Sequence, residues 1–260
     1  MTALAEGLTH STYHTVRQIR ALLRQPVFVA ITLIQPFIWL LLFGALFKRV
    51  VEIPGFNARS YVDYLAPGIV VMTGFFAGGW NGVAILNDME RGTLDRFLVT
   101  PARRIALIAG PLGYQAVATV IQSLIILAVG YGLGARYSGP LGVIVFLVAV
   151  VLLCSALAAM SNAIALLVRQ EESLIGFVQF TALPLTFLST ALMPANLVPE
   201  WVANIAKFNP VNWAIEVGRS ALGSDPDWGL IGTRLLYLLG FTALLVWAAL
   251  AAFRSYQRSV

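Results

Sequence analysis

The sequence predicts an all-α membrane protein whose six helices cross a lipid bilayer. Of its 260 residues, 59% are hydrophobic and only 11% are charged, and the mean hydropathy is +0.82. Soluble domains typically carry about 25% charged residues. Apolar runs of about 20 residues recur along the chain, which is the length that a helix needs to cross the hydrocarbon core of a membrane. This combination excludes an ordinary soluble domain.

The apolar runs must be helices, because hydrocarbon offers no water to satisfy backbone N–H and C=O groups. An even number of spans places both ends of the chain on the same side of the membrane. The predicted spans are residues 26–47, 64–86, 105–133, 141–168, 174–193 and 230–253. With their connections they form one predicted transmembrane domain, residues 26–260.

The distribution of Lys and Arg predicts the orientation of the chain in the cell membrane. Ten arginines fall in the segments on the side of the two termini, and six lysines and arginines fall on the other side. Short loops on the cytoplasmic side carry the excess of positive charge. Both termini are therefore predicted to be cytoplasmic. The net charge of +5 is interpreted as a basic membrane face and not as a nucleic-acid-binding surface.

Residues 1–25 form a separate predicted element, an amphipathic helix that lies in the membrane interface. Arg17, Arg20 and Arg24 share one face of a helical wheel, and apolar residues such as Val16 and Leu23 share the other. Such a helix places its apolar side in the acyl boundary and its basic side against anionic head groups. The alternative is a plain cytoplasmic lead-in that only supplies positive charge.

A stripe of glycines in the second span predicts close helix packing. Gly74, Gly78 and Gly82 recur every fourth residue. In lipid, such small residues let two helix backbones approach closely. The partner is expected to be a helix of the same chain, with a second copy of the chain as the alternative. In the fourth span, Ser161 and Asn162, with Ser155, are expected to bridge helices by hydrogen bonds.

Aromatic residues in the second and fifth spans are candidates for lining a substrate route. Packing within the bundle or contact with lipid is the simpler interpretation of each. The candidates are Phe75, Phe76, Trp80, Phe177, Phe180 and Phe187.

The charged segment 86–104 separates the second and third spans and is the most informative stretch of the chain. Seven of its 19 residues are charged, and they surround a small apolar cluster of Leu94, Phe97 and Leu98. Thr100-Pro101 discourages further helix. An apolar centre with an ionic rim is typical of a protein–protein interface. A solvated loop would explain the charges but not the apolar cluster.

Two blocks of this sequence resemble the signatures of ABC-2 type export permeases, of the daunorubicin-resistance kind. The first is ERGTLDR at residues 90–96, followed by Thr100-Pro101 and Arg103. The second precedes the last span, at residues 194–201 and 209–219. The resemblance also includes the amphipathic lead-in and the first span, so it covers nearly the whole chain.

The resemblance implies a dimer of permease subunits, identical or different, with two copies of a separate cytoplasmic ABC ATPase. It implies that ATP and Mg²⁺ bind to that partner, and that a coupling helix after the second span contacts the ATPase. The implied coupling residues are Asp88, Glu90, Arg91, Gly92, Thr93, Leu94, Asp95, Arg96, Phe97 and Leu98.

The resemblance further implies two short extracytoplasmic helices before the sixth span, Leu197–Phe208 and Pro210–Leu222, which dip back into the outer leaflet. The signature positions in this region are Pro199, Trp201, Asn209, Pro210, Glu216 and Arg219. The pattern of residues agrees in part. Asn209 with Pro210 is an N-cap and first-turn pair, and Gly223 is a plausible end of the helix. Glu216 and Arg219 are three residues apart and could pair locally.

The sequence shows no pattern for an ATP-binding loop and none for a metal site. A phosphate-binding loop for ATP ends in Gly-Lys-Ser/Thr, whereas neither of the two lysines, Lys48 and Lys207, follows a glycine. The two histidines, His10 and His14, have no carboxylate patterned with them, and Cys154 is the single cysteine. We therefore expect a transport subunit that is not an enzyme and binds no cofactor or metal.

The function predicted from these features is export of a hydrophobic or amphipathic substrate, drug or lipid-like, powered by the partner ATPase. Export of a polysaccharide or glycolipid is an open alternative, and import or lipid flipping is not excluded. An ion-coupled secondary transporter is less favoured, because such proteins often place charges and broken helices at the midplane of two related halves. The deep spans here are almost free of charge.

Overall fold

The computed structural model describes residues 26–54, 56, 58–91 and 104–259, and the whole described chain is helical or irregular without strands. The predicted all-α class is therefore confirmed. The predicted interfacial helix of residues 1–25 lies outside the described residues. The elements are α2 (Pro26–Leu46), η1 (Lys48–Glu52), α3 (Tyr61–Gly79), α4 (Asn81–Glu90), α6 (Arg104–Gly132), α7 (Pro140–Val168), α8 (Glu171–Phe187), η2 (Ala195–Leu197), α9 (Glu200–Ala206), α10 (Pro210–Leu222) and α11 (Trp228–Ser259).

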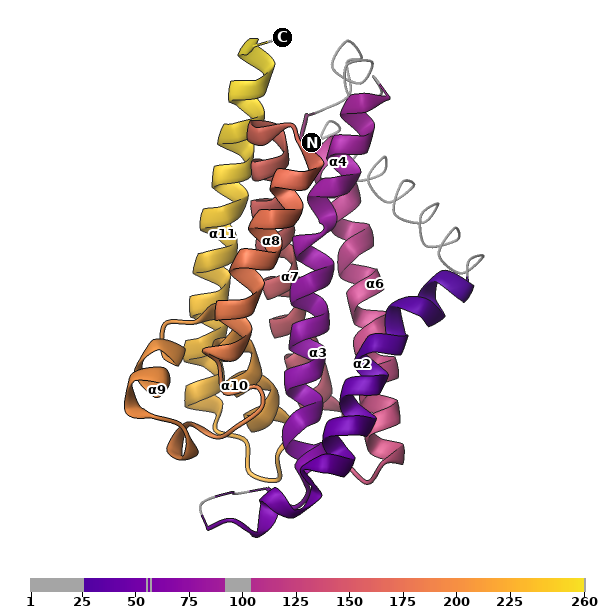
Figure 1. Cartoon of the computed structure of the whole chain (residues 1–260). Helices are drawn as coiled ribbons and strands as arrows, with labels where there is room; N and C mark the ends of the chain where they lie inside the picture. Colours follow the sequence, from indigo (N-terminus) through magenta and orange to yellow (C-terminus); the bar gives the residue numbers. More distant parts are fainter. Residues whose placement is uncertain (1–25, 55, 57, 92–103, 260) are drawn as a thin grey trace.

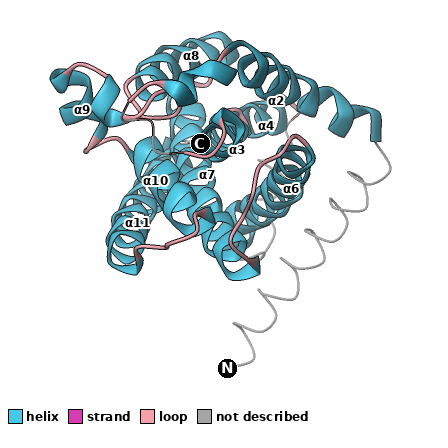
Figure 2. Ribbon diagram, turned by 90° about the horizontal axis from the view of Figure 1, so that it is seen from below, coloured by secondary structure: helices cyan, strands magenta, loops and turns pink. Residues whose placement is uncertain are grey.

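The long helices run side by side along one direction, and α7 lies in their midst (Figures 1 and 2). Helix α7 packs against α3, α4, α6, α8, α10 and α11. Its inward residues are small or aliphatic, with Phe146, Val150 and Leu153 fully buried. The core of the bundle is therefore built around α7. The short helices α9 and α10 lie at the end of the bundle opposite the C-terminus (Figure 1).

Four helices of the described chain are long and apolar enough to cross a membrane. They are Tyr61–Glu90, Gly113–Gly132, Pro140–Val168 and Trp228–Arg254, and Thr32–Leu46 is a shorter apolar helix. These five segments agree in place with five of the predicted spans. The count of six spans stays a prediction, because the helix at the fifth predicted span, α8, has 17 residues and is not among the four.

Two predicted spans differ from the observed helices in their bounds. The second span comprises two helices: α3 and α4 meet at Trp80 and together form the apolar segment Tyr61–Glu90. The fifth ends at Phe187 and not at Met193, so residues 188–194 leave the helix. At about 1.5 Å per residue, α8 is shorter than the roughly 30 Å hydrocarbon core. Apolarity alone could not locate this end, because four of residues 188–194 are still apolar: Leu188, Ala191, Leu192 and Met193.

Local signals explain several helix ends. The Ser60 hydroxyl accepts a hydrogen bond from the Asp63 N–H and caps α3, at 3.1 Å. Pro140 occupies the first turn of α7, where its missing N–H costs nothing. Helix α10 begins and ends as predicted, with Asn209 as its N-cap and Gly223 as its C-cap.

The glycine stripe of the second span faces α7 of the same chain. A Cβ at Gly74 would lie 2.9 Å from Val150 Cγ1, and a Cβ at Gly78 or Gly82 would overlap the carbonyl oxygen of Cys154 or Ser161. The three glycines therefore let α3 and α4 lie directly on the backbone of α7, as small residues do between helices in lipid.

We predict that Gly78→Ala destabilises the bundle by about 1–3 kcal/mol, because the added methyl group cannot fit against α7 without moving a backbone. The measurement is the midpoint of thermal unfolding of the purified protein. The matched control is Gly176→Ala on α8, where a Cβ meets nothing within 4 Å. A Gly78→Ala variant as stable as this control would contradict the packing described.

Candidate functional site

The predicted coupling residues begin at the exposed end of α4. Asp88 and Glu90 are exposed in the last turn of this helix, and Arg91 caps it. They continue the second long helix and do not start a separate one. The remaining predicted coupling residues, 92–98, lie outside the described residues. In Figure 1 this end of α4 lies at the same end of the bundle as the C-terminal part of α11.

The junction between α3 and α4 is held by the hydroxyl group of Ser161 on α7. Ser161 Oγ donates a hydrogen bond to the Gly79 carbonyl at 2.5 Å and accepts one from the Gly82 N–H at 3.0 Å. A break in a helix leaves such backbone groups without their usual partners, and leaving them unpaired in an apolar interior is costly. Ser161 therefore satisfies both sides of the break with one side chain.

Further contacts attach α4 to its neighbours. Asn81 Nδ2 donates to Asn162 Oδ1 of α7 at 3.0 Å. Leu86 is buried in a small cluster with Ala165 of α7 and with Leu174 and Val178 of α8. Ser161 and Asn162 thus bridge helices as expected, whereas Ser155 makes no such bond within the described part. Helix α4, which carries the charged end, therefore packs against both α7 and α8.

At the opposite end, residues 188–194 form a loop that runs inside the protein. Ser189, Thr190 and Ala191 are 7%, 6% and 0% exposed. Their carbonyl groups have left the helix and need donors from elsewhere. The hydroxyl of Tyr64 donates to the Thr190 carbonyl at 2.7 Å, and that of Tyr61 donates to the Leu192 carbonyl at 3.1 Å.

Arg219 of α10 supplies most of the remaining donors. Its guanidinium donates to the Thr190 carbonyl at 2.6 Å, the Ala191 carbonyl at 3.1 Å and the Thr190 hydroxyl at 3.0 Å. Its Nε donates to the Tyr64 carbonyl at 3.3 Å. The group also lies over the Tyr64 ring, 3.5 Å from its centroid, which adds a cation–π attraction. Arg219 therefore joins α10, α3 and the buried loop.

The predicted local pair between Glu216 and Arg219 is wrong for the described structure. Glu216 instead accepts from Arg234 of α11 at 2.6 Å and from Asn212 at 2.8 Å. Asn212 Oδ1 accepts in turn from the Thr190 hydroxyl and N–H, at 2.6 and 3.0 Å. The physical reason is tertiary: Arg234 of α11 forms the ion pair with Glu216, and Arg219 is satisfied by neutral acceptors of α3 and the buried loop. A continuous chain of hydrogen bonds results, from α11 through α10 to the loop.

Burial moves the pKa values of Arg219 and Tyr137 at this end. Burial lowers the pKa of Arg219 to about 10, and the nearby Tyr64 and Glu216 act in the opposite direction. Arg219 therefore keeps its charge at neutral pH. Burial raises the pKa of the Tyr137 phenol, and the Asp63 carboxylate raises it further. The Tyr137 hydroxyl donates a hydrogen bond to the Leu127 carbonyl at 3.1 Å.

The remaining signature residues have separate places. Asn209 Nδ2 donates to the carbonyls of Leu185 and Leu188, at 2.6 and 3.1 Å, and so ties the start of α10 to the end of α8. Pro210 occupies the first turn of α10, and Pro199 precedes α9 as its N-cap. Trp201 on α9 is 61% exposed.

The aromatic candidates for a substrate route are not gathered in one place. Phe75 is 2% exposed and packs edge-on against Phe76, so it belongs to the core of the bundle. Phe177, Phe180 and Phe187 project outward from α8, at 39%, 79% and 60% exposure, and Trp80 is 36% exposed. In the described residues, no group of His, Cys, Asp and Glu side chains could hold a metal ion.

Sequence reasoning missed Tyr61, Tyr64, Thr190 and Asn212. A signal was present for the tyrosines, because two hydroxyl-bearing residues three apart in an apolar helix imply buried partners. Nothing in the sequence indicated the loop carbonyls that they meet.

We predict that Ser161→Ala destabilises the protein by about 1–3 kcal/mol, because two buried backbone groups at the α3–α4 junction lose their shared partner. Thermal unfolding followed by circular dichroism measures the change. Ser155→Ala on the same helix removes an equivalent hydroxyl and is expected to change stability little. Equal effects of the two substitutions would rule out the role given to Ser161.

We also predict that Arg219→Lys destabilises the protein by about 1–3 kcal/mol, although the charge is kept. A compact ammonium cannot reproduce the planar fork that spans the Thr190, Ala191 and Tyr64 acceptors. The measurement is again the unfolding midpoint. The control is Arg49→Lys, an exposed position in η1, for which a change within about 0.5 kcal/mol is expected.

Comparison with known proteins places this architecture in a family. The family model described as ABC-2 type transporter matches residues 12–222, which end at the last residue of α10. The putative transport permease ycf38 of Cyanophora paradoxa is 32% identical over 79% of this chain and 71% of its own length. The daunorubicin resistance ABC transporter permease protein DrrB1 of Streptomyces coeruleorubidus is 23% identical over 93% of this chain and 85% of its own. The probable multidrug ABC transporter permease YbhR of Escherichia coli K12 is 26% identical over 75% and 53%. The family model covers most of this all-helical chain, including three of the four long apolar helical segments in its described part. The chain therefore belongs to the ABC-2 type transporter family.

Proposed function

We propose that this ABC transporter membrane subunit exports a hydrophobic or amphipathic substrate from the cytoplasm. Its energy comes from two copies of a separate ABC ATPase, which binds ATP and Mg²⁺, and it works beside a second permease subunit in the cell membrane. Two kinds of support exist for the substrate class. Relatives are named for resistance to daunorubicin and doxorubicin, and the described long helices expose large apolar side chains and few charges.

The observation that carries the proposal is the exposed, charged end of α4. Asp88, Glu90 and Arg91 are exposed where α4 ends, at the head of the charged segment. A force applied there by an ATPase reaches the bundle directly, because α4 is attached to α7 by Ser161 and to α8 by the Leu86 cluster. In this proposal the junction at Trp80 is the point at which α4 moves relative to α3. Movement of these helices would open the outward route.

The orientation follows from the same proposal. The end of α4 faces the cytoplasm, together with the C-terminal part of α11, which lies at that end in Figure 1. Helices α9 and α10 then lie on the outer side, where the substrate leaves. The excess of arginine in segments on the side of the termini supports this arrangement.

We predict that Glu90→Arg uncouples transport from ATP hydrolysis. In the proposed interface, Glu90 faces positive charge on the ATPase. An arginine at this position would place two like charges together, which costs several kcal/mol at an interface. The measurement is permease-dependent stimulation of ATPase activity, in membranes that contain both proteins. We expect stimulation to fall at least about tenfold.

The matched control is Glu200→Arg, the same charge reversal in the first turn of α9 at the other end of the bundle. It is expected to leave stimulation of the ATPase unchanged. Normal assembly and unchanged stimulation with Glu90→Arg would contradict the coupling role. Substrate flux driven by an ion gradient in the absence of any ATPase would contradict the transport class itself.

A further inference from the structure

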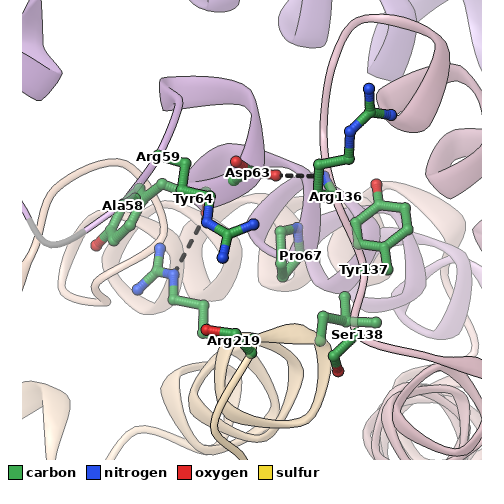
Figure 3. Close-up of a pocket in the computed structure, with 12 residues that line it drawn as sticks. Ala58, Arg59, Asp63, Tyr64, Pro67, Arg136, Tyr137, Ser138 and Arg219 are labelled. Carbon is green, nitrogen blue, oxygen red and sulfur yellow. Dashed lines mark hydrogen bonds between the residues drawn. The ribbon is translucent and has the colours of Figure 1, made fainter.

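A pocket of about 250 Å³ opens at the end of the bundle that holds α10. Its walls come from the start of α3, from the loop between α6 and α7, and from the end of α10 (Figure 3). The charged residues that line it are Arg59, Asp63, Arg136 and Arg219. Three cations and one carboxylate therefore share a small space.

In the described structure, the carboxylate of Asp63 forms no ion pair with these cations. Asp63 Oδ2 accepts from the Ser60 hydroxyl at 3.1 Å, and Oδ1 accepts from the backbone N–H of Arg136 at 2.6 Å. Both oxygens are thus engaged by neutral donors. In the described part of the chain, the ion pair found is Arg234 with Glu216, and Asp63 forms none. The lining keeps an excess of two positive charges.

The guanidinium groups retain free donors. Arg59 is exposed and contacts no acceptor among the described residues. The guanidinium of Arg136 has one described contact, over the Tyr131 ring at 5.2 Å. Arg219 uses four of its five N–H groups on Tyr64, Thr190 and Ala191. Figure 3 shows Arg59 reaching across the pocket, whereas Arg136 extends away from the pocket at its rim.

We propose that this pocket binds a phosphate-bearing anion. The free guanidinium of Arg59, the one remaining N–H of Arg219 and the cation of Arg136 at the rim can meet several oxygens of a phosphate, and charge-assisted bonds of this kind are the strong ones. A volume of about 250 Å³ lies at the small end of ligand pockets. It fits a phosphate or a lipid head group and is too small for a whole amphipathic drug.

The phosphate has two possible sources, a phospholipid head group or free phosphate. Guanidinium groups form charge-assisted hydrogen bonds with the phosphate of either source. The start of α3 and the end of α10, which line the site, lie at the end of the bundle opposite the end of α4 (Figure 1), and the proposed binding involves no ATP. It goes beyond the proposed export function, and either one can fail without the other.

The experiment titrates the purified full-length protein in phosphate-free detergent buffer. Three probes are used: inorganic phosphate, dihexanoylphosphatidylglycerol and zwitterionic dihexanoylphosphatidylcholine. Binding is measured by calorimetry and by the shift in thermal unfolding. We expect saturable binding of phosphatidylglycerol, of phosphate or of both. Binding of the lipid alone identifies a head group as the ligand, and binding of phosphate identifies the free anion as sufficient.

Three variants test the assignment of the site. Arg59→Gln is expected to weaken binding about tenfold, because it removes a direct charge-assisted contact. Arg136→Gln, at the rim, is expected to weaken it by a smaller factor, and the backbone bond from residue 136 to Asp63 remains. Arg49→Gln is the matched control, an exposed arginine outside the pocket. It is expected to leave affinity unchanged.

The proposal is overturned by any of three results. The first is the absence of saturable binding of both anionic probes to the unaltered protein. The second is an equal loss of affinity in Arg49→Gln and Arg59→Gln, which would indicate general surface charge. The third is binding of phosphatidylcholine as tight as that of phosphatidylglycerol and indifferent to Arg59→Gln, which would indicate apolar contact. An unchanged unfolding midpoint without ligand shows that the variants are folded.

Discussion

The buried loop after α8 imposes the constraint on which one end of this bundle depends. Carbonyl groups of Thr190, Ala191 and Leu192 lie inside a helical protein without a helical partner. In such an interior each must receive a hydrogen bond. Tyr61, Tyr64 and Arg219 provide them from α3 and α10. These donors fix where α10 sits, and α10 in turn holds α11 through Glu216 and Arg234.

The other end of the bundle is governed by close approach of helix backbones. Gly74, Gly78 and Gly82 bring α3 and α4 onto α7, and the Ser161 hydroxyl pairs the two backbone groups that their junction leaves free. The result is a stiff central helix with a broken helix beside it. That arrangement suits a protein that must transmit movement along its length, because packed elements shift between discrete arrangements and do not deform smoothly.

The charged residues of the described chain fall into two groups, those with partners inside the bundle and those exposed at its ends. Among the described residues, Glu216, Arg219 and Arg234 are held by partners on other elements. Asp88, Glu90 and Arg91 are exposed at one end, and Arg59 and Arg136 line a pocket at the other. A charge in apolar surroundings is costly unless paired. Charges that have no described partner therefore lie where another molecule or water can reach them.

The sequence by itself determined the helical class, the places of five apolar helices and the bounds of α10. Each follows from a local rule: run length, glycine spacing, or the Asn209-Pro210 cap and the Gly223 stop. It could not determine where α8 ends, which cation Glu216 meets, or that Arg219 serves carbonyls of a distant loop. Those outcomes were decided by tertiary structure, because a hydrogen bond between residues such as Tyr64 and Thr190, 126 positions apart, leaves no periodic trace along the chain.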